Sequence, residues 1–196
     1  MKNLKRTFIL SIFILVLSLA VKAQTGLKNG DVAPNFIAKD SEGKSINLKQ
    51  LLKQNKAVVL FFYRGQWCPY CNKHIKDLQD SLQSLNAKGA YVVGVTPETN
   101  ESISKTKEKT KASFSLVSDR GYKIMKDYRV DFVMEETLAS KYKTYGIDVA
   151  KNNGATDAVL PVPATYIIGK DGKIKFVQFD TDYKKRASIK QILAVL

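Results

Sequence analysis

Two cysteines, Cys68 and Cys71, are separated in the chain by only Pro69 and Tyr70. They follow an apolar run typical of a buried strand and precede a pattern typical of a helix. Backbone N–H groups and the positive end of the dipole at a helix N-terminus stabilise a thiolate, and in such pairs a thiol pKa can fall to ~3.5–7. Two intervening residues also let the sulfurs close a strained, reducible disulfide. The spacing therefore predicts a redox-active dithiol.

The other potential metal ligands are few. The 196-residue chain has two Cys and one His, too few for a closed zinc site built from these residue types alone. His74 follows Cys71 by about one helical turn, where it could tune a thiolate or join both sulfurs as a metal ligand. We expect it to face the solvent instead. The sequence thus predicts neither a metal nor an organic cofactor.

The cysteines belong to a chain of alternating strands and helices. Residues 57–63 form a β-branched and aromatic run, the pattern of a strand buried on both faces. Apolar residues at helical spacing run from Ile75 to Leu85 and predict an amphipathic helix that Gly89 ends. Residues 91–95 predict a second buried strand.

The alternation continues toward the C-terminus. Residues 101–111 predict a polar surface helix, and residues 115–117 predict a short strand. Residues 164–168 and 173–179 flank a Gly-Lys-Asp-Gly turn and predict a β-hairpin, which a terminal helix over residues 188–196 follows. This order implies a central, mostly parallel sheet covered by helices.

The stretch from residue 127 to 160 fits the alternation poorly. We interpret it as an insertion beside the hairpin, with a helix over residues 135–145 and a loop at Asn152-Asn153-Gly154. With 44% apolar residues in the whole chain, a single packed domain is expected and wholesale disorder is excluded.

The N-terminus has the layout of a secretory signal peptide. Basic residues open the chain, an apolar run covers residues 8–21, and small residues precede Gln24. At ~1.5 Å per residue the run spans ~21 Å, short of the ~30 Å hydrocarbon core, so an uncleaved anchor is the weaker alternative. We expect residues 1–23 to be removed and residues 24–196 to form one exported domain, periplasmic or extracellular, with no stable membrane span.

The chain is basic, with 32 Lys and Arg against 18 Asp and Glu and a net charge of +14. Its densest basic run, residues 105–111, has no interleaved aromatic residues. An exported chain also rarely meets nucleic acid. We therefore predict a solvated helix and no nucleic-acid partner, while the oligomeric state stays open.

The dithiol and a later proline resemble the thioredoxin fold. Trp67 precedes the cysteine pair, and Val162-Pro163-Ala164-Thr165 leads into the first hairpin strand. In that fold the C-x-x-C motif opens a helix and a cis-proline lies against it. The resemblance implies that Pro163 is this cis-proline and presents the Val162 backbone to an incoming disulfide. Pro161 is the other candidate, and an ordinary strand-entry proline is the alternative.

More of the chain resembles the peroxiredoxin-like AhpC/TSA (thiol-specific antioxidant) branch of the thioredoxin-fold superfamily. The resemblance runs from GDVAPNF at residue 30, through LFFYRGQWCPYC, to LPVPATYIIGKDGKI. It implies an α/β, thioredoxin-like fold with a central mixed sheet flanked by helices. It also implies an N-terminal extension and an insertion before the cis-proline hairpin.

The active-site signature departs from that branch. Peroxiredoxins carry P-x-x-x-T-x-x-C and an arginine across the site. Here Arg64 stands at the proline position, Cys68 at the threonine and Cys71 at the peroxidatic cysteine, while Pro163 replaces the arginine. Without the threonine and arginine to stabilise developing charge, we expect slow peroxide reduction. Arg64 could supply some positive charge, although we expect it to make a surface or loop contact.

Three functions follow from these patterns. In an antioxidant peroxidase, Cys71 attacks a hydroperoxide and Cys68 resolves the sulfenic acid. In a thiol–disulfide reductase, Cys68 attacks a protein disulfide and Cys71 resolves it. Either enzyme takes electrons from an external, thioredoxin-like dithiol, whereas a metal-carrying chaperone rests on His74 alone. The whole-chain resemblance favours the peroxidase. We assign its site to Cys71, Cys68, Pro163, Trp67 and Arg64.

The charged and then apolar N-terminus predicts that the mature protein begins at or near Gln24. Mass spectrometry of protein recovered from the envelope fraction of the native cell checks this. Recovery of the intact Met1 terminus from the cytosol would contradict it.

Overall fold

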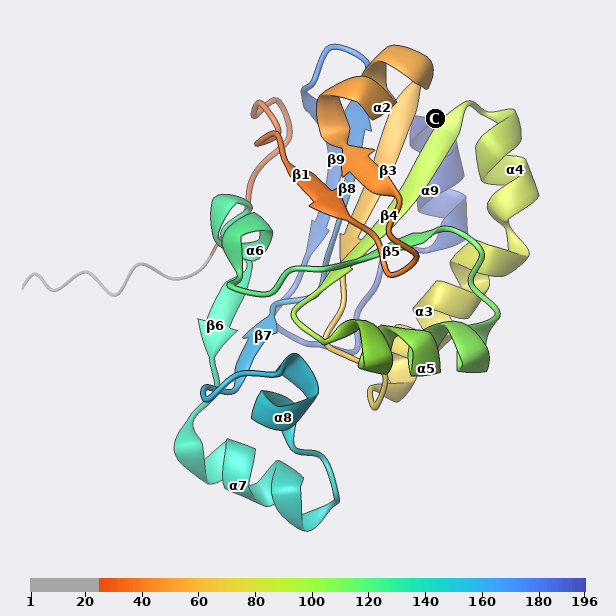
Figure 1. The fold of residues 1–196 in the computed structure, drawn as a ribbon. Helices are drawn as coiled ribbons and strands as arrows, with labels where there is room; N and C mark the ends of the chain where they lie inside the picture. The colour runs from red at the N-terminus through yellow and green to blue at the C-terminus, as the bar shows by residue number, and fades with distance from the viewer. Residues whose placement is uncertain (1–24) are drawn as a thin grey trace, which may run out of the picture.

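A mixed sheet forms the centre of the fold (Figure 1). The structure is a computed structural model and describes residues 25–196. The sheet contains five strands: β3 (Ala57–Phe62), β4 (Ala90–Thr96), β5 (Ser115–Ser118), β8 (Ala164–Gly169) and β9 (Ile174–Phe179). They follow the order β5-β4-β3-β8-β9, with β3, β4 and β5 parallel and β8 antiparallel to both of its neighbours. The predicted α/β fold with a mixed sheet is confirmed.

Strand β3 lies between β4 and β8, and all of its residues are buried. Successive side chains of a strand point to opposite faces of the sheet. Val58, Leu60 and Phe62 therefore enter one hydrophobic core, and Val59 and Phe61 enter the other. The uninterrupted apolar run of β3 reflects this burial on two sides.

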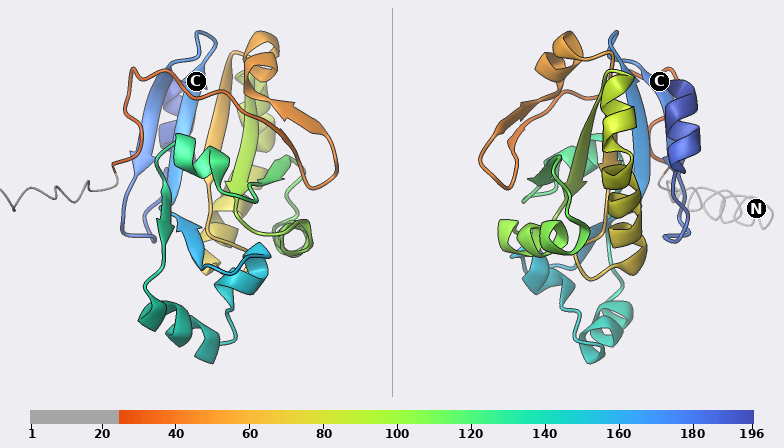
Figure 2. Two further views of the ribbon diagram at one scale, coloured as in Figure 1. Left: turned by 60° about the vertical axis from the view of Figure 1, so that its left-hand side comes forward. Right: turned by 90° about the vertical axis from the view of Figure 1, so that its right-hand side faces the viewer.

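Helices cover both faces of the sheet (Figure 2). The helices are α2 (Leu48–Gln54), α3 (Pro69–Asp80), α4 (Leu82–Ala87), α5 (Asn100–Thr110), α6 (Lys123–Asp127), α7 (Glu136–Thr144), α8 (Val149–Asn153) and α9 (Ile189–Val195). Apolar residues of α3, α4, α5 and α9 pack into the core that holds Val59 and Phe61, while those of α2 and α6 pack into the opposite core. Cys68 and Cys71 belong to the first of these cores.

The long helix predicted after the cysteines is divided in two. Ser81, with φ −101° and ψ 4°, separates α3 from α4. Its N–H still donates to the Asp77 carbonyl at 3.2 Å, so the break is a local kink. Ile75 and Leu85 remain fully buried on either side, which is why the apolar spacing continues through the kink.

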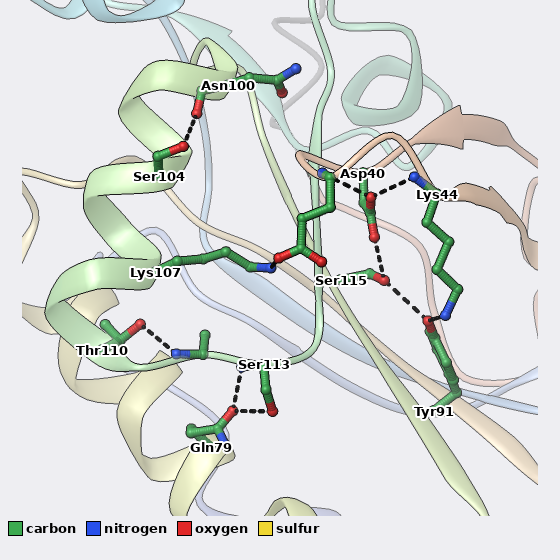
Figure 3. A network of polar contacts seen from close by, with 12 residues as sticks. Asp40, Lys44, Gln79, Tyr91, Asn100, Ser104, Lys107, Thr110, Ser113 and Ser115 are labelled. Carbon is green, nitrogen blue, oxygen red and sulfur yellow. Dashed lines mark hydrogen bonds and ion pairs between the residues drawn. The ribbon is translucent and has the colours of Figure 1, made fainter.

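An N-terminal hairpin of β1 (Ile37–Lys39) and β2 (Ser45–Asn47) packs beside the edge strand β5. Asp40 fixes this contact: its carboxylate accepts from Ser115 Oγ at 2.8 Å and from the Lys44 N–H at 2.9 Å (Figure 3). Tyr91 completes the network through hydrogen bonds with the Ser115 hydroxyl and the Lys44 ammonium. These residues are all part of the expected N-terminal extension or of the strands it covers.

The predicted insertion lies directly before β8. Strands β6 (Asp131–Val133) and β7 (Val159–Pro161) pair antiparallel and bracket α7 and α8. The helix predicted over residues 135–145 is confirmed as α7. The predicted loop at residues 152–154 is wrong in part, because Asp148 caps α8 and the helix continues to Asn153 before Gly154 ends it in the left-handed conformation.

The predicted signal peptide over residues 1–23 lies outside the described residues, so its removal stays a prediction. Within residues 25–196, no helix has both the length and the apolar character needed to cross a membrane.

Truncation of the central strand should destabilise the protein strongly. Leu60→Ala removes a side chain with no exposed surface in β3, and we expect a loss of about 2–5 kcal/mol in the free energy of unfolding, measured with urea. Leu138→Ala on α7, where the side chain is 41% exposed, is the matched control and should change stability by less than about 0.5 kcal/mol. Equal effects would contradict the position of the core.

Candidate active site

The two cysteines occupy the first turn of α3. Cys68 is the N-cap residue, and its Sγ accepts a hydrogen bond from the Cys71 N–H at 3.3 Å. Pro69 takes the first helical position, where its fixed φ suits the helix and its missing N–H costs nothing. The sequence therefore places both sulfurs at the positive end of α3, as predicted.

Both cysteines are free thiols in this structure, and each residue is only 1% exposed. Their sulfurs share a hydrogen bond of 2.6 Å. Two further donors approach Cys71 Sγ: the Arg64 backbone N–H and Arg186 Nη2, each at 3.5 Å. Cys71 Sγ is thus the sulfur on which the donors converge.

These contacts make Cys71 the acidic thiol. Burial by itself would raise its pKa, but the hydrogen bond with Cys68, the charge of Arg186 and the Arg64 N–H outweigh it and lower the pKa to about 6. The same shared hydrogen bond, together with burial, raises the pKa of Cys68 well above its ordinary value. At neutral pH the shared proton therefore stays on Cys68, and Cys71 is a thiolate.

Arg64 is buried, with 5% of its surface exposed, so the predicted surface contact is wrong, whereas a loop contact is present, because Arg64 packs against Tyr183 in the segment between β9 and α9. Its guanidinium carbon lies 4.9 Å from the ring centroid of Trp67, 5.6 Å from that of Tyr142 and 4.5 Å from that of Tyr183. It also donates to the Tyr142 hydroxyl at 2.8 Å. We call these three rings the Arg64 cage; cation–π attraction in a desolvated place accounts for the burial of the charge.

Trp67 is part of the site because it belongs to this cage. The other two rings come from the insertion, which supplies Tyr142, and from the C-terminal segment, which supplies Tyr183. The Trp67 ring packs edge-on against Tyr142 of α7, with centroids 5.6 Å apart. Tyr183 in turn packs edge-on against Tyr70 of α3, at 5.8 Å. The structure thus brings Trp67 and Arg64 together with the cysteines and adds two tyrosines that sequence reasoning did not find.

His74 is also buried, at 5% exposure, and the prediction that it faces the solvent is wrong. Its ring packs edge-on against Phe61 of β3, with centroids 5.5 Å apart. Burial, followed by the positive charge of Arg186, lowers the pKa of His74 to about 4. A neutral imidazole suits this apolar face because it carries no charge into the core.

Pro163 is buried directly before β8, but it does not act as the predicted cis-proline. The peptide bonds of residues 25–196 are all trans, the form that X–Pro bonds ordinarily prefer. The Val162 N–H donates to the Val130 carbonyl at 2.7 Å. Because an internal partner occupies this N–H, it is not free to bind an incoming disulfide.

Sequence reasoning missed two charged residues of the site. Arg186 lies in the segment between β9 and α9, and no motif distinguishes it from the adjacent Lys184 and Lys185. Glu98 follows β4 and has no exposed surface. A signal for Glu98 did exist, because the carboxyl ends of the parallel strands β3 and β4 lie at the same edge of the sheet, where such sites form.

No group of three or more His, Cys, Asp and Glu side chains within residues 25–196 is arranged to hold a metal ion. The site instead combines three groups: the buried, acidic Cys71 sulfur, the Cys68 thiol that is hydrogen-bonded to it, and the Arg186 guanidinium that donates to it. This chemistry, on a central mixed sheet with the dithiol at the start of a helix, defines a thiol-dependent oxidoreductase of the thioredoxin-like class.

The chain belongs to the AhpC/TSA family, whose model matches residues 29–177. It is 25% identical over 170 residues to the putative chloroplastic peroxiredoxin Q of Oryza sativa subsp. indica, covering 87% of this chain and 67% of the relative. It is 31% identical over 104 residues to peroxiredoxin Bcp of Escherichia coli, covering 53% of this chain and 65% of the relative. The predicted membership of the peroxiredoxin-like branch is confirmed.

Solved structures support the fold. Peroxidoxin BcpB from Mycobacterium tuberculosis is 22% identical and has a TM-score of 0.66, with 86% of this chain and 96% of that one covered. A cysteine-to-serine mutant of PrxQ from Xylella fastidiosa is 18% identical and has a TM-score of 0.64, with 87% and 94% covered. The thioredoxin-like fold is therefore confirmed.

Removal of the Arg186 charge should make Cys71 less acidic. In Arg186→Met, we expect the pH midpoint of Cys71 alkylation by iodoacetamide to rise from about 6 by ~1 unit or more, because a cation within this distance favours the thiolate. Lys184→Met, in the same exposed segment, is the control and should leave the midpoint unchanged. An unchanged midpoint in Arg186→Met would show that the guanidinium does not act on the sulfur.

Proposed function

We propose that this protein is an exported, thiol-dependent peroxidase that reduces hydroperoxides through Cys71 and Cys68. The observation that carries the proposal is the convergence of Arg186 Nη2, the Arg64 N–H and the Cys68 thiol on the Cys71 sulfur. This arrangement supplies a thiolate at neutral pH and a positive charge beside the point of attack. The relatives named peroxiredoxin support the same chemistry.

In the first step, the Cys71 thiolate attacks the terminal oxygen of the hydroperoxide. A sulfur–oxygen bond forms and the oxygen–oxygen bond breaks, so that Cys71 becomes a sulfenic acid that keeps the hydroperoxide's own hydrogen, and the alkoxide leaves and takes a proton from water to become an alcohol. Arg186 faces the sulfur and can stabilise the negative charge that moves onto the departing oxygen. It thus takes the place of the arginine that Pro163 replaces.

In the second step, Cys68 resolves the sulfenic acid. Its sulfur already lies 2.6 Å from that of Cys71, so the disulfide can form with little movement of α3. Cys68 loses a proton, the sulfur–sulfur bond forms, and the hydroxyl group leaves as water. A thioredoxin-like dithiol then reduces this disulfide by exchange and becomes oxidised itself.

The alternative, a protein-disulfide reductase in which Cys68 attacks, has less support. Cys68 is the less acidic thiol and is almost completely buried. The Val162 N–H, which would receive a substrate disulfide, is bonded to Val130. A small hydroperoxide suits the buried sulfurs better than a protein disulfide does. The export of the protein rests on the charged and apolar pattern of residues 1–23 alone.

Serine variants of the two cysteines test the assignment of roles. Cys68→Ser should consume one equivalent of hydrogen peroxide and leave a sulfenic acid at Cys71, trappable with dimedone and located by mass spectrometry. Cys71→Ser should lose peroxide consumption, with a rate at least ~10²-fold lower, because the attacking thiolate is gone.

A parallel assay with insulin disulfides and a dithiol reductant separates the two enzyme functions. The peroxidase proposal expects measurable, although slow, peroxide turnover and little insulin reduction by the wild-type protein. It fails if Cys68→Ser is inert to peroxide while Cys71→Ser accumulates mixed disulfides at Cys68.

A further inference from the structure

Arg186 reaches the Cys71 sulfur from a segment without regular secondary structure. Residues 180–188 lie between β9 and α9 and form neither helix nor strand. The residues from Thr181 to Lys185 are exposed, and yet Arg186 Nη2 lies 3.5 Å from Cys71 Sγ. Fixing a long arginine side chain on such a segment costs conformational entropy. Other contacts must therefore hold the segment in place.

Tyr183 attaches this segment to the Arg64 side chain. Its ring centroid lies 4.5 Å from the Arg64 guanidinium carbon, closer than those of Trp67 and Tyr142. The same ring packs edge-on against Tyr70 of α3, with centroids 5.8 Å apart. Tyr183 keeps 37% of its surface exposed, so the ring lies at the protein surface and contacts a buried cation. The attraction between the ring and this cation therefore ties the exposed segment to the loop after β3.

Tyr183 is in turn bonded to the guanidinium of Arg186. Arg186 Nη1 donates to the Tyr183 carbonyl and, at 2.7 Å, to the Lys185 carbonyl. The other terminal nitrogen, Nη2, is the one that donates to Cys71. The next residue, Ala187, is buried in the core that holds the cysteines. The guanidinium is thus fixed on one side by the backbone at Tyr183 and directed at the sulfur on the other.

From this series of contacts, we propose that Tyr183 is a positioning residue: through its contact with the Arg64 cation, it holds the Arg186 guanidinium on the Cys71 sulfur. Arg64 therefore acts on the sulfur in two ways, directly through its backbone N–H and indirectly through the ring that its side chain binds. The inference concerns the thiolate itself and holds for either function of the dithiol, so it goes beyond the proposed peroxidase.

Several titratable or charged groups surround Cys71, and a test must separate Arg186 from the others. Arg186 belongs to the segment that carries Tyr183, and its charge favours the Cys71 thiolate. A change at Arg64 is unsuitable, because the charge of Arg64 also acts on Cys68. The groups other than Arg186 that face the sulfur are Cys68 at the start of α3, Tyr63 and Arg64 after β3, and Glu98 after β4.

Variants of Tyr183 test this role without any peroxide. Tyr183→Leu removes the ring at an exposed position, where the replacement leaves the core intact, whereas Tyr183→Phe keeps the ring. Tyr145→Leu, on a tyrosine that is 71% exposed at the end of α7, is the matched control. The readout is the pH midpoint of Cys71 alkylation by iodoacetamide, with the alkylated cysteine located by mass spectrometry. Arg186→Met, alone and combined with Tyr183→Leu, completes a double-mutant cycle, and urea unfolding checks that each variant is folded.

We expect Tyr183→Leu to raise the midpoint by ~0.5 unit or more, because the Arg186 charge is no longer held on the sulfur. Tyr183→Phe and Tyr145→Leu should keep the wild-type midpoint. Adding Tyr183→Leu to Arg186→Met should cause no further rise, since Tyr183 acts only through Arg186.

An unchanged midpoint in Tyr183→Leu, or a further rise in the double variant, would overturn the proposal. A Tyr183→Phe midpoint as high as that of Tyr183→Leu would overturn it too, because the ring is then not the group that matters. Since alkylation needs no peroxide, a protein that shows the expected midpoints but fails to reduce peroxide counts against the proposed function alone.

Discussion

A negative charge on sulfur, held away from bulk water, is the constraint around which the site is arranged. Burial of a thiolate is unfavourable unless donors and positive charge compensate for the lost hydration. Cys71 receives this compensation from three directions: the Cys68 thiol, the Arg64 backbone N–H and the Arg186 guanidinium. Each donor belongs to a different part of the fold, so the helix start, the loop after β3 and the C-terminal segment must all be in place before the sulfur becomes acidic.

The two arginines contact the Cys71 sulfur through different groups, one through its backbone and the other through its side chain. Arg64 adjoins the signature in sequence, yet its side chain is held among aromatic rings and only its backbone reaches the sulfur. Arg186 lies 115 positions from Cys71 along the chain and places its guanidinium on the sulfur. The positive charge beside the Cys71 sulfur thus comes from the segment before the last helix.

The sequence alone predicted the parts of the fold that depend on local pattern. Three such patterns each predict an element from nearby residues alone. They are the apolar run of β3, the helical spacing of Ile75 and Leu85, and the hairpin turn at residues 169–172. The placement of Cys68 and Cys71 at a helix start followed from the same patterns. Arg186 and the Arg64 cage could not be predicted, because they depend on how the insertion and the C-terminal segment fold back over the site. His74 was misjudged because its polarity suggested solvent, whereas its position on the inner face of α3 next to Phe61 decided its burial.

The Arg64 cage has a consequence for how the molecule can be observed. Trp67, one of its three rings, is the single tryptophan of the whole chain. Its indole lies against the Tyr142 ring and the Arg64 guanidinium, one residue from Cys68. Ultraviolet emission excited at the red edge of the aromatic band therefore comes from the redox centre alone. Tryptophan fluorescence of this protein therefore reports on the surroundings of the two cysteines and not on the rest of the fold.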